Sequence, residues 1–385
     1  MKLHSLGATC VNGEKLYMVS SDFNALFCVD MNDWIAEYKT SFEVYSKELP
    51  ILFGKGSWAE DIIYFMPYNS GHVVIYHIED NTKEYIEIGA KPNVAISSCL
   101  DGENLWLFFI DYPNRILKLN LNSHDVQEQY LDWTYIFRAT GMKETDLDDR
   151  IRTYTILNTQ KRDNQIWIVL YNIPGILLTY DIITGKTEVH KIEGLEKEVF
   201  SSIALLEDCI WINITDKHIL ARWEYDTHKL DIVNYEATGM DEVLSVSAHI
   251  GKYIIVARRN ELISLDITDC TLKTMSYSDG VEFRSYERIG NKILFYPYEG
   301  DSIVIFDSDT NEISEHQVKC ERDLDDQIME QWYGNYIWED KACNLNEYTG
   351  AIPSREKREK NRKKPDNAGS TIWEKIKQQI IMEEK

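Results

Sequence analysis

Side chains that could bind a ligand or exchange protons recur in turns that follow short apolar runs of this chain. Ten of the twelve candidates lie in such turns, and the other two, Arg138 and Arg152, lie in an insertion at 134–153. The full set of candidate ligand-binding or partner-binding residues is Tyr68, His72, Asp111, Tyr112, Arg138, Arg152, Tyr171, His218, Arg258, Arg259, Tyr298 and Glu299. Aromatic and arginine side chains offer stiff contact area and forked hydrogen bonding, which recognition surfaces favour. The pattern therefore predicts a recognition surface. The alternative is that variety among the turns alone produces it.

The chain carries none of the short motifs that assign catalytic roles directly. It has no GxSxG elbow, no HExxH pair and no glycine-rich phosphate loop. Seven cysteines are spread along the chain without a CxxC or a zinc-type spacing. Catalytic residues are therefore unassigned, and the sequence predicts no metal and no cofactor.

The candidate turns belong to a repeat of about 43 residues. Each repeat holds an apolar run, a half-buried second strand and a more polar third strand, as in 104–131, and small residues precede the run. The seven apolar runs begin at Leu16, Ile62, Leu105, Ile166, Ile210, Tyr253 and Ile293. Four strands per repeat of this length are typical of a β-propeller blade. We therefore predict an all-β chain, a seven-bladed β-propeller of four-stranded antiparallel blades.

Two alternatives concern the number of blades and their closure. Residues 327–340 could add a pair of strands near the seam or begin an eighth blade. Seven is favoured because the remaining chain is too short and too charged for four further strands. The sequence does not indicate which strands close the ring.

The faces of the predicted ring differ in composition. Turns on one face, such as DNTKE, DITDCT and DSDTNE, are plain turns rich in Asp, Asn and Thr, whereas the candidate residues gather on the other face. The insertion lies between the third and fourth repeats, where the connection belongs to the candidate face. It could serve as a lid or contact loop, or it could be a tolerated surface loop.

The composition changes after the repeats, which suggests three segments: a propeller over 1–351, a charged linker over 352–366 and an amphipathic helix over 367–385. The linker contains SREKREKNRKKP, and the helix aligns Ile372, Ile376 and Ile380 on one face. An isolated helix of this length is marginal in water. The helix could dock on the propeller, on a partner chain or on nothing.

Charge and hydropathy exclude several functional classes. The formal net charge of -23 disfavours nucleic-acid binding by the body of the protein. No run reaches the roughly 18 apolar residues that a membrane span needs. The N-terminus lacks a long apolar signal region, so the expected location is cytoplasmic, with reduced thiols.

The repeat resembles those of seven-bladed propellers of the streptogramin-lyase type. The likeness lies in Asn104-Leu105-Trp106 entering a core strand and in Arg115 to Leu119 after the turn. That resemblance implies a metal-dependent lyase with a catalytic histidine on the ligand face. This chain, however, lacks the recurrent Gly-Asp-Gly-Asn lead-in, and no motif assigns that histidine. Kelch-like propellers are an equally good comparison and imply binding.

The function predicted from the sequence is a non-catalytic propeller scaffold that binds a protein partner or a small polar ligand on its Tyr/Arg-rich face. The alternative is a lyase or hydrolase acting on a sugar-like or small polar substrate at the channel mouth. Asp111, Glu299 and His218 would then exchange protons. The arginines that would neutralise a substrate carboxylate are Arg138, Arg152, Arg258 and Arg259.

Overall fold

The computed structural model describes most of the repeat region. The described residues are 6–20, 25–42, 53–59, 61–67, 70–89, 94–148, 151–152, 155–171, 173–236, 246–258, 260–278, 283–297 and 302–320. The charged linker, the C-terminal helix and residues 327–340 of the sequence predictions lie outside these ranges. Among the described residues no helix is long and apolar enough to cross a bilayer.

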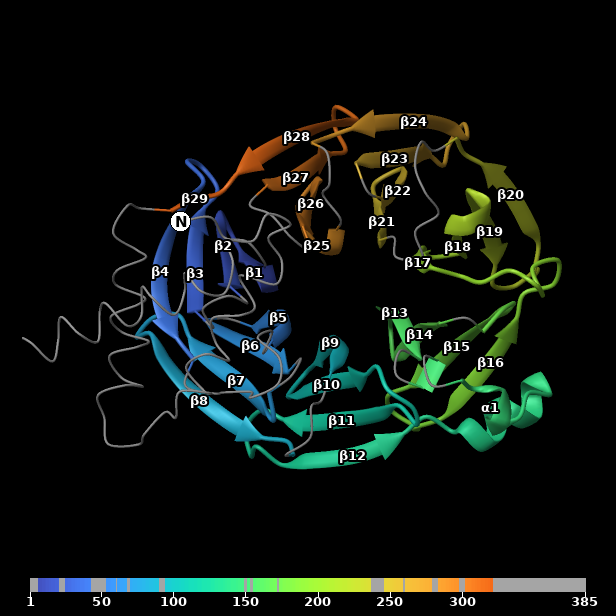
Figure 1. The fold of residues 1–385 in the computed structure, drawn as a ribbon, viewed down its shortest axis with the longest axis horizontal. Coiled ribbons are helices and arrows are strands. Elements are labelled where there is room, and N and C mark those ends of the chain that lie inside the picture. Colours follow the sequence, from blue (N-terminus) through green and yellow to red (C-terminus); the bar gives the residue numbers. More distant parts are fainter. Residues whose placement is uncertain are drawn as a thin grey trace, which may run out of the picture.

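Seven four-stranded antiparallel sheets form a ring of blades, which confirms the predicted fold (Figure 1). Blades one and two contain β1 (Leu6–Asn12), β2 (Lys15–Ser20), β3 (Ala25–Asp30), β4 (Ile35–Ser41), β5 (Phe53–Ala59), β6 (Ile62–Pro67), β7 (His72–His77) and β8 (Thr82–Glu87). Blades three and four contain β9 (Ala95–Asp101), β10 (Asn104–Phe109), β11 (Arg115–Asn120), β12 (Val126–Tyr130), β13 (Ile156–Arg162), β14 (Gln165–Leu170), β15 (Ile176–Asp181) and β16 (Thr187–Lys191).

The remaining blades follow the same order. Blades five and six contain β17 (Ser202–Leu205), β18 (Cys209–Ile214), β19 (Ile219–Glu224), β20 (Leu230–Asn234), β21 (Val246–Ile250), β22 (Tyr253–Arg258), β23 (Glu261–Asp266) and β24 (Thr271–Ser276). Blade seven contains β25 (Phe283–Ile289), β26 (Lys292–Pro297), β27 (Ser302–Asp307) and β28 (Glu312–Gln317), and β29 (Lys319–Cys320) follows it. The first strand of each blade lies nearest the axis (Figure 1).

The apolar core is divided among the junctions between neighbouring blades, because the second strand of each blade is buried on both faces. In β10, Leu105 packs toward blade two, whereas the next residue, Trp106, packs toward blade four. Each of the seven junctions, including the one between blades seven and one, contains such a cluster. This double burial explains why the apolar runs are uninterrupted rather than alternating.

The ring is closed by a short strand that the sequence did not identify. β29 joins the outer edge of blade one by pairing in parallel with β4, and Lys319 donates its backbone N–H to the Trp34 carbonyl (2.8 Å). The Trp34 ring stacks on His316 of blade seven, with ring centroids 4.4 Å apart. The last described residues therefore cover an edge strand of the first blade.

The plain turns predicted for one face have a structural role. At the end of the third strand in five blades, an Asp or Asn side chain accepts the backbone N–H two residues ahead. These residues are Asp30, Asn120, Asp181, Asp266 and Asp307. The side chain thereby stabilises the turn into the outer strand, which accounts for the uniform composition of this face.

Candidate functional site

The insertion between blades three and four forms a helix at the rim of the face opposite the plain turns. α1 (Trp133–Thr140) begins after Asp132, whose side chain accepts the Tyr135 N–H (2.9 Å), and it ends at Gly141 with φ 80°. The helix packs beside β16 (Figure 1). A short 3-10 helix, η1 (Glu144–Asp146), follows it.

A buried asparagine joins this helix to the turn between β10 and β11. Asn114 donates its side-chain amide to the carbonyls of Phe109 and Ile110 (3.1 Å each) and accepts the Trp133 indole N–H (3.1 Å). The same residue has φ 56°, a conformation that asparagine adopts more readily than most residues. These bonds hold turn and helix together as one unit.

Aromatic and arginine side chains gather on this unit, and we call the five residues Tyr112, Trp133, Phe137, Arg138 and Arg152 the ledge. Trp133 is buried and Arg138 is exposed, whereas the other three are partly exposed. The ring centroids of Tyr112 and Trp133 are 5.2 Å apart, and those of Trp133 and Phe137 are 5.3 Å apart. The Arg152 guanidinium lies 5.1 Å from the Tyr112 ring centroid, and the Tyr112 N–H donates to the Arg152 carbonyl (2.8 Å). Burial, followed by the neighbouring Glu144 carboxylate, raises the pKa of Tyr112.

Arg152 is fixed in place although its side chain is 36% exposed. Its guanidinium donates to the carbonyls of Leu147 (3.2 Å) and Glu144 (3.0 Å) and lies 3.4 Å from the Glu144 carboxylate. Arg138, by contrast, is exposed on α1, with its guanidinium 5.8 Å from the Tyr135 ring centroid. The ledge thus combines a fixed arginine, an exposed arginine and apolar rings, which is a typical composition of binding surfaces.

Two further predicted residues lie next to the ledge. Asp111 is exposed at the start of the same turn. Tyr171 is buried beneath the ledge in the apolar cluster between blades three and four, and its N–H donates to the Thr155 carbonyl (2.8 Å). Tyr171 therefore supports the ledge from below.

A second group of predicted residues meets at the junction of blades five and six, on the same face. His218, with φ 54°, follows the 3-10 helix η2 (Thr215–Lys217), and its ring stacks on Tyr235 at 5.6 Å. The Arg258 guanidinium lies 5.9 Å from the same tyrosine ring and 3.5 Å from the Glu261 carboxylate. Burial raises the pKa of Tyr235 to about 12, and its hydroxyl donates to Asn213 (3.0 Å).

Tyr235 and Trp133 were absent from the sequence predictions, although a signal for Tyr235 exists. In blades two to six, the residue after the outer strand donates its N–H to the turn between the second and third strands. These residues are Ile88, Leu131, Ile192, Tyr235 and Tyr277. Aligning the blades would have shown that blades five and six carry a tyrosine where the others carry an aliphatic residue.

One further predicted site residue that the structure describes, His72, belongs to neither group. His72 begins β7, and its ring lies 6.3 Å from that of Tyr85 in an edge-on arrangement. Tyr68, Arg259, Tyr298 and Glu299 lie outside the described residues. Asp111 and His218, two proton-exchanging candidates of the enzyme alternative, belong to blades three and five, with blade four between them.

The channel along the axis is crossed by a side chain from blade four. The Gln160 amide nitrogen donates to the Ile203 carbonyl of blade five and lies 3.4 Å from the Ser247 carbonyl of blade six. The Gln160 side-chain oxygen accepts the Leu205 N–H (3.2 Å). Within the described part of the chain, no group of three or more His, Cys, Asp or Glu side chains could hold a metal ion.

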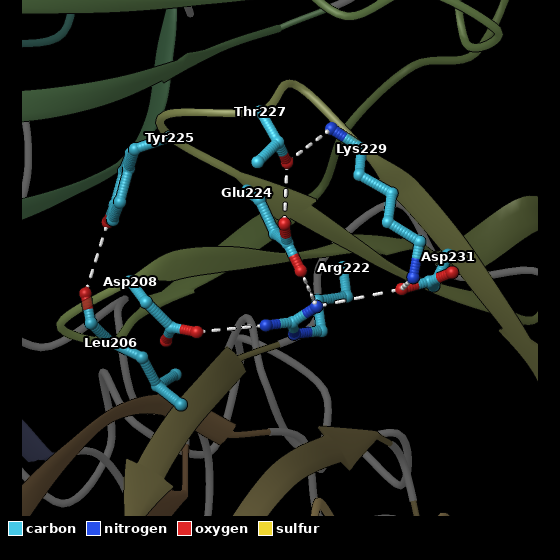
Figure 2. A network of polar contacts seen from close by, with 8 residues as sticks. All are labelled: Leu206, Asp208, Arg222, Glu224, Tyr225, Thr227, Lys229 and Asp231. Atoms are coloured by element: carbon cyan, nitrogen blue, oxygen red, sulfur yellow. Dashed lines mark hydrogen bonds and ion pairs between the residues drawn. The ribbon is translucent and has the colours of Figure 1, made fainter.

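A charged network stabilises blade five on the face that carries the plain turns (Figure 2). Arg222 contacts the carboxylates of Asp208 (2.9 Å), Asp231 (3.6 Å) and Glu224. Glu224 ends β19, as Asp181 and Asp266 end their strands, and it accepts from Thr227 in the following turn. The network therefore corresponds to the turn-stabilising carboxylates of the other blades.

Comparison with known proteins supports the fold alone. No family model and no curated protein sequence matches this chain. YCF48 from Cyanidioschyzon merolae is similar in structure, with a TM-score of 0.61 at 12% identity over 81% of this chain and 97% of that one. Saccharomyces cerevisiae Sqt1 has a TM-score of 0.55 at 9% identity over 81% and 85%. PorZ, a surface component of the type-IX secretion system of Porphyromonas gingivalis, has a TM-score of 0.53 at 7% identity, and the match covers 82% of this chain but only 38% of PorZ.

Proposed function

We propose that this protein is a non-catalytic scaffold that binds a protein partner through the ledge. The observation that carries the proposal is the arrangement of Tyr112, Phe137, Arg138 and Arg152 on a unit held by the buried Asn114. Rigid aromatic and arginine side chains lose little conformational entropy on binding, so they contribute strongly to association.

The charge of the ledge indicates how a partner would bind. Arg138 is exposed, while Glu144 already engages Arg152. A partner that places an acidic side chain at Arg138 and an apolar side chain against Phe137 would complement this surface. The rest of the propeller acts as a rigid support.

The proposal is tested by affinity capture from native lysate with three full-length baits. They are the wild-type protein, the double variant Phe137→Ala/Arg138→Glu, and the control Lys186→Glu, which reverses an exposed charge on the opposite face of blade four. A partner held by wild type and control but lost from the double variant supports the ledge as the binding surface.

Other capture results would contradict the proposal. A partner that binds the double variant as well as wild type, or is lost only from the control, places binding elsewhere. Absence of any specific partner from all three baits overturns the scaffold proposal. Circular dichroism of each bait confirms that loss of capture does not reflect unfolding.

A further inference from the structure

A buried ion pair lies at the second group of site residues, away from the ledge. Arg258 and Glu261 face each other at the last paired position of the β22–β23 hairpin. Both side chains are 3% exposed, and the nearest nitrogen and oxygen are 3.5 Å apart. Burying two charges is unfavourable unless hydrogen bonds satisfy their polar atoms.

The hydrogen bonds of this arginine are incomplete. Its Nε and Nη1 atoms are buried and have no hydrogen-bond partner among the described residues, although Nη1 is the nitrogen that forms the ion pair with Glu261. Nearly all buried polar groups in proteins are hydrogen-bonded, so these two donors leave room for an acceptor that the described residues do not supply.

The described tyrosines beside Arg258 do not supply that acceptor. The Tyr235 hydroxyl donates to Asn213, and the Tyr277 hydroxyl donates to the backbone carbonyl of Arg258 itself. Tyr235 instead places the face of its ring 5.9 Å from the guanidinium carbon. The described surroundings therefore offer an aromatic wall beside the unsatisfied donors.

The charges around Arg258 select the kind of acceptor. The Glu261 carboxylate faces the guanidinium charge. Burial, followed by the Glu261 and Asp216 carboxylates, raises the pKa of Tyr235, whereas Arg258 lowers it. A carboxylate or phosphate bound here would add a further negative charge close to Glu261 in a poorly hydrated site, where repulsion is strong. A neutral acceptor meets no such repulsion.

We infer that Arg258 is a recognition site for a neutral carbonyl oxygen, that of a peptide bond or a carboxamide. The inference rests on the proposed binding role of this protein and adds a second contact on the same face, with a defined chemistry. Because the arginine side chain is only 3% exposed, the side chains that cover it must move aside as the carbonyl enters.

The inference is tested on the isolated full-length protein, with arginine side chains labelled with 15N at Nε. The Nε–H resonance of Arg258 is assigned by its loss in Arg258→Lys. N-methylacetamide and sodium acetate are then titrated separately at equal concentrations and equal ionic strength. We expect a saturable shift of the Arg258 resonance with N-methylacetamide and none with acetate.

The variant Glu261→Gln provides the matched control, because it removes the balancing charge and nearly preserves the shape. In this variant we expect acetate to shift the Arg258 resonance. If Glu261→Gln does not fold, the two titrations of the wild-type protein decide the question alone.

Two outcomes overturn the inference. A saturable shift with acetate but not with N-methylacetamide in the wild-type protein makes this an anion site. A resonance that neither probe moves makes the pair a structural feature whose donors are satisfied by water. Neither outcome depends on the capture experiment, so failure of the scaffold proposal and failure of this inference are distinguishable.

Discussion

The side-chain nitrogen of Gln160 lies 3.3 Å from the hydroxyl oxygen of Tyr286. These residues belong to blades four and seven, so a single carboxamide links distant parts of the ring across the axis. The same side chain also bonds to the backbone of blade five. The propeller is therefore joined at its centre as well as at its seam.

Replacing Gln160 with alanine should lower the free energy of unfolding by about 1–3 kcal/mol, because buried backbone groups of blade five lose their partner. The measurement is urea denaturation followed by tryptophan fluorescence. Gln127→Ala, on the exposed outer strand β12, is the control and should change stability by less than about 0.5 kcal/mol. Equal effects of the two substitutions would show that water replaces the amide at no cost.

The parallel pairing of β29 with β4 should depend on one backbone donor. Lys319→Pro removes the N–H that bonds to the Trp34 carbonyl, so we expect a loss of about 1–3 kcal/mol in the free energy of unfolding. Lys319→Ala keeps the N–H and should remain within about 0.5 kcal/mol of wild type. Chemical denaturation of the full-length variants makes the comparison. If proline and alanine behave alike, β29 does not contribute to closure.

The contribution of Arg222 to the stability of the folded protein should depend on pH. Hydrogen bonds from Thr227 and Arg222 lower the pKa of Glu224, and those from Lys229 and Arg222 lower the pKa of Asp231. A carboxylate whose pKa is lower in the folded state stabilises the fold above its unfolded pKa, about 4, and loses that contribution as the pH falls through the folded pKa.

Arg222→Gln should therefore lower Tm clearly at pH 7 and by a smaller amount at pH 4. Arg222→Lys keeps the charge without the planar fork, so its Tm at pH 7 should lie between those of wild type and Arg222→Gln. Thermal unfolding at the two pH values measures the difference. A loss for Arg222→Gln that is the same at both pH values would mean that packing, rather than charge, gives Arg222 its role.

His218 should tolerate asparagine better than alanine. Its φ of 54° is unfavourable for a residue with a Cβ atom, and asparagine accepts this conformation more readily than alanine does. We expect His218→Ala to be about 1 kcal/mol less stable than His218→Asn in chemical denaturation. The same pair of substitutions at Lys217, within η2, should not show that preference. A matching preference at both positions would remove the backbone explanation.

Some residues of the candidate site were identified from the sequence, and others were missed. The turns holding Tyr112 and His218 were located because their residue types differ from those of the opposite face. Trp133 and Tyr235 were missed because each stands among apolar residues, and their side-chain polar atoms bond to Asn114 and Asn213, which are distant in the sequence. The partners are separated in the chain, so the repeat pattern marks the position of Tyr235 but not the bonds that these two residues make.

The sequence by itself determined the blades, because hairpins of neighbouring strands are local and a strand buried on both faces needs an uninterrupted apolar run, as in β10. Only the tertiary structure decided the contacts that form when the ring closes. The pairing of β29 with β4, the contact of Gln160 with Tyr286, and the meeting of His218, Tyr235 and Arg258 all join different blades or the two ends of the propeller. Their geometry is fixed by how seven twisted sheets pack around one axis, and no repeat of 43 or so residues encodes that packing alone.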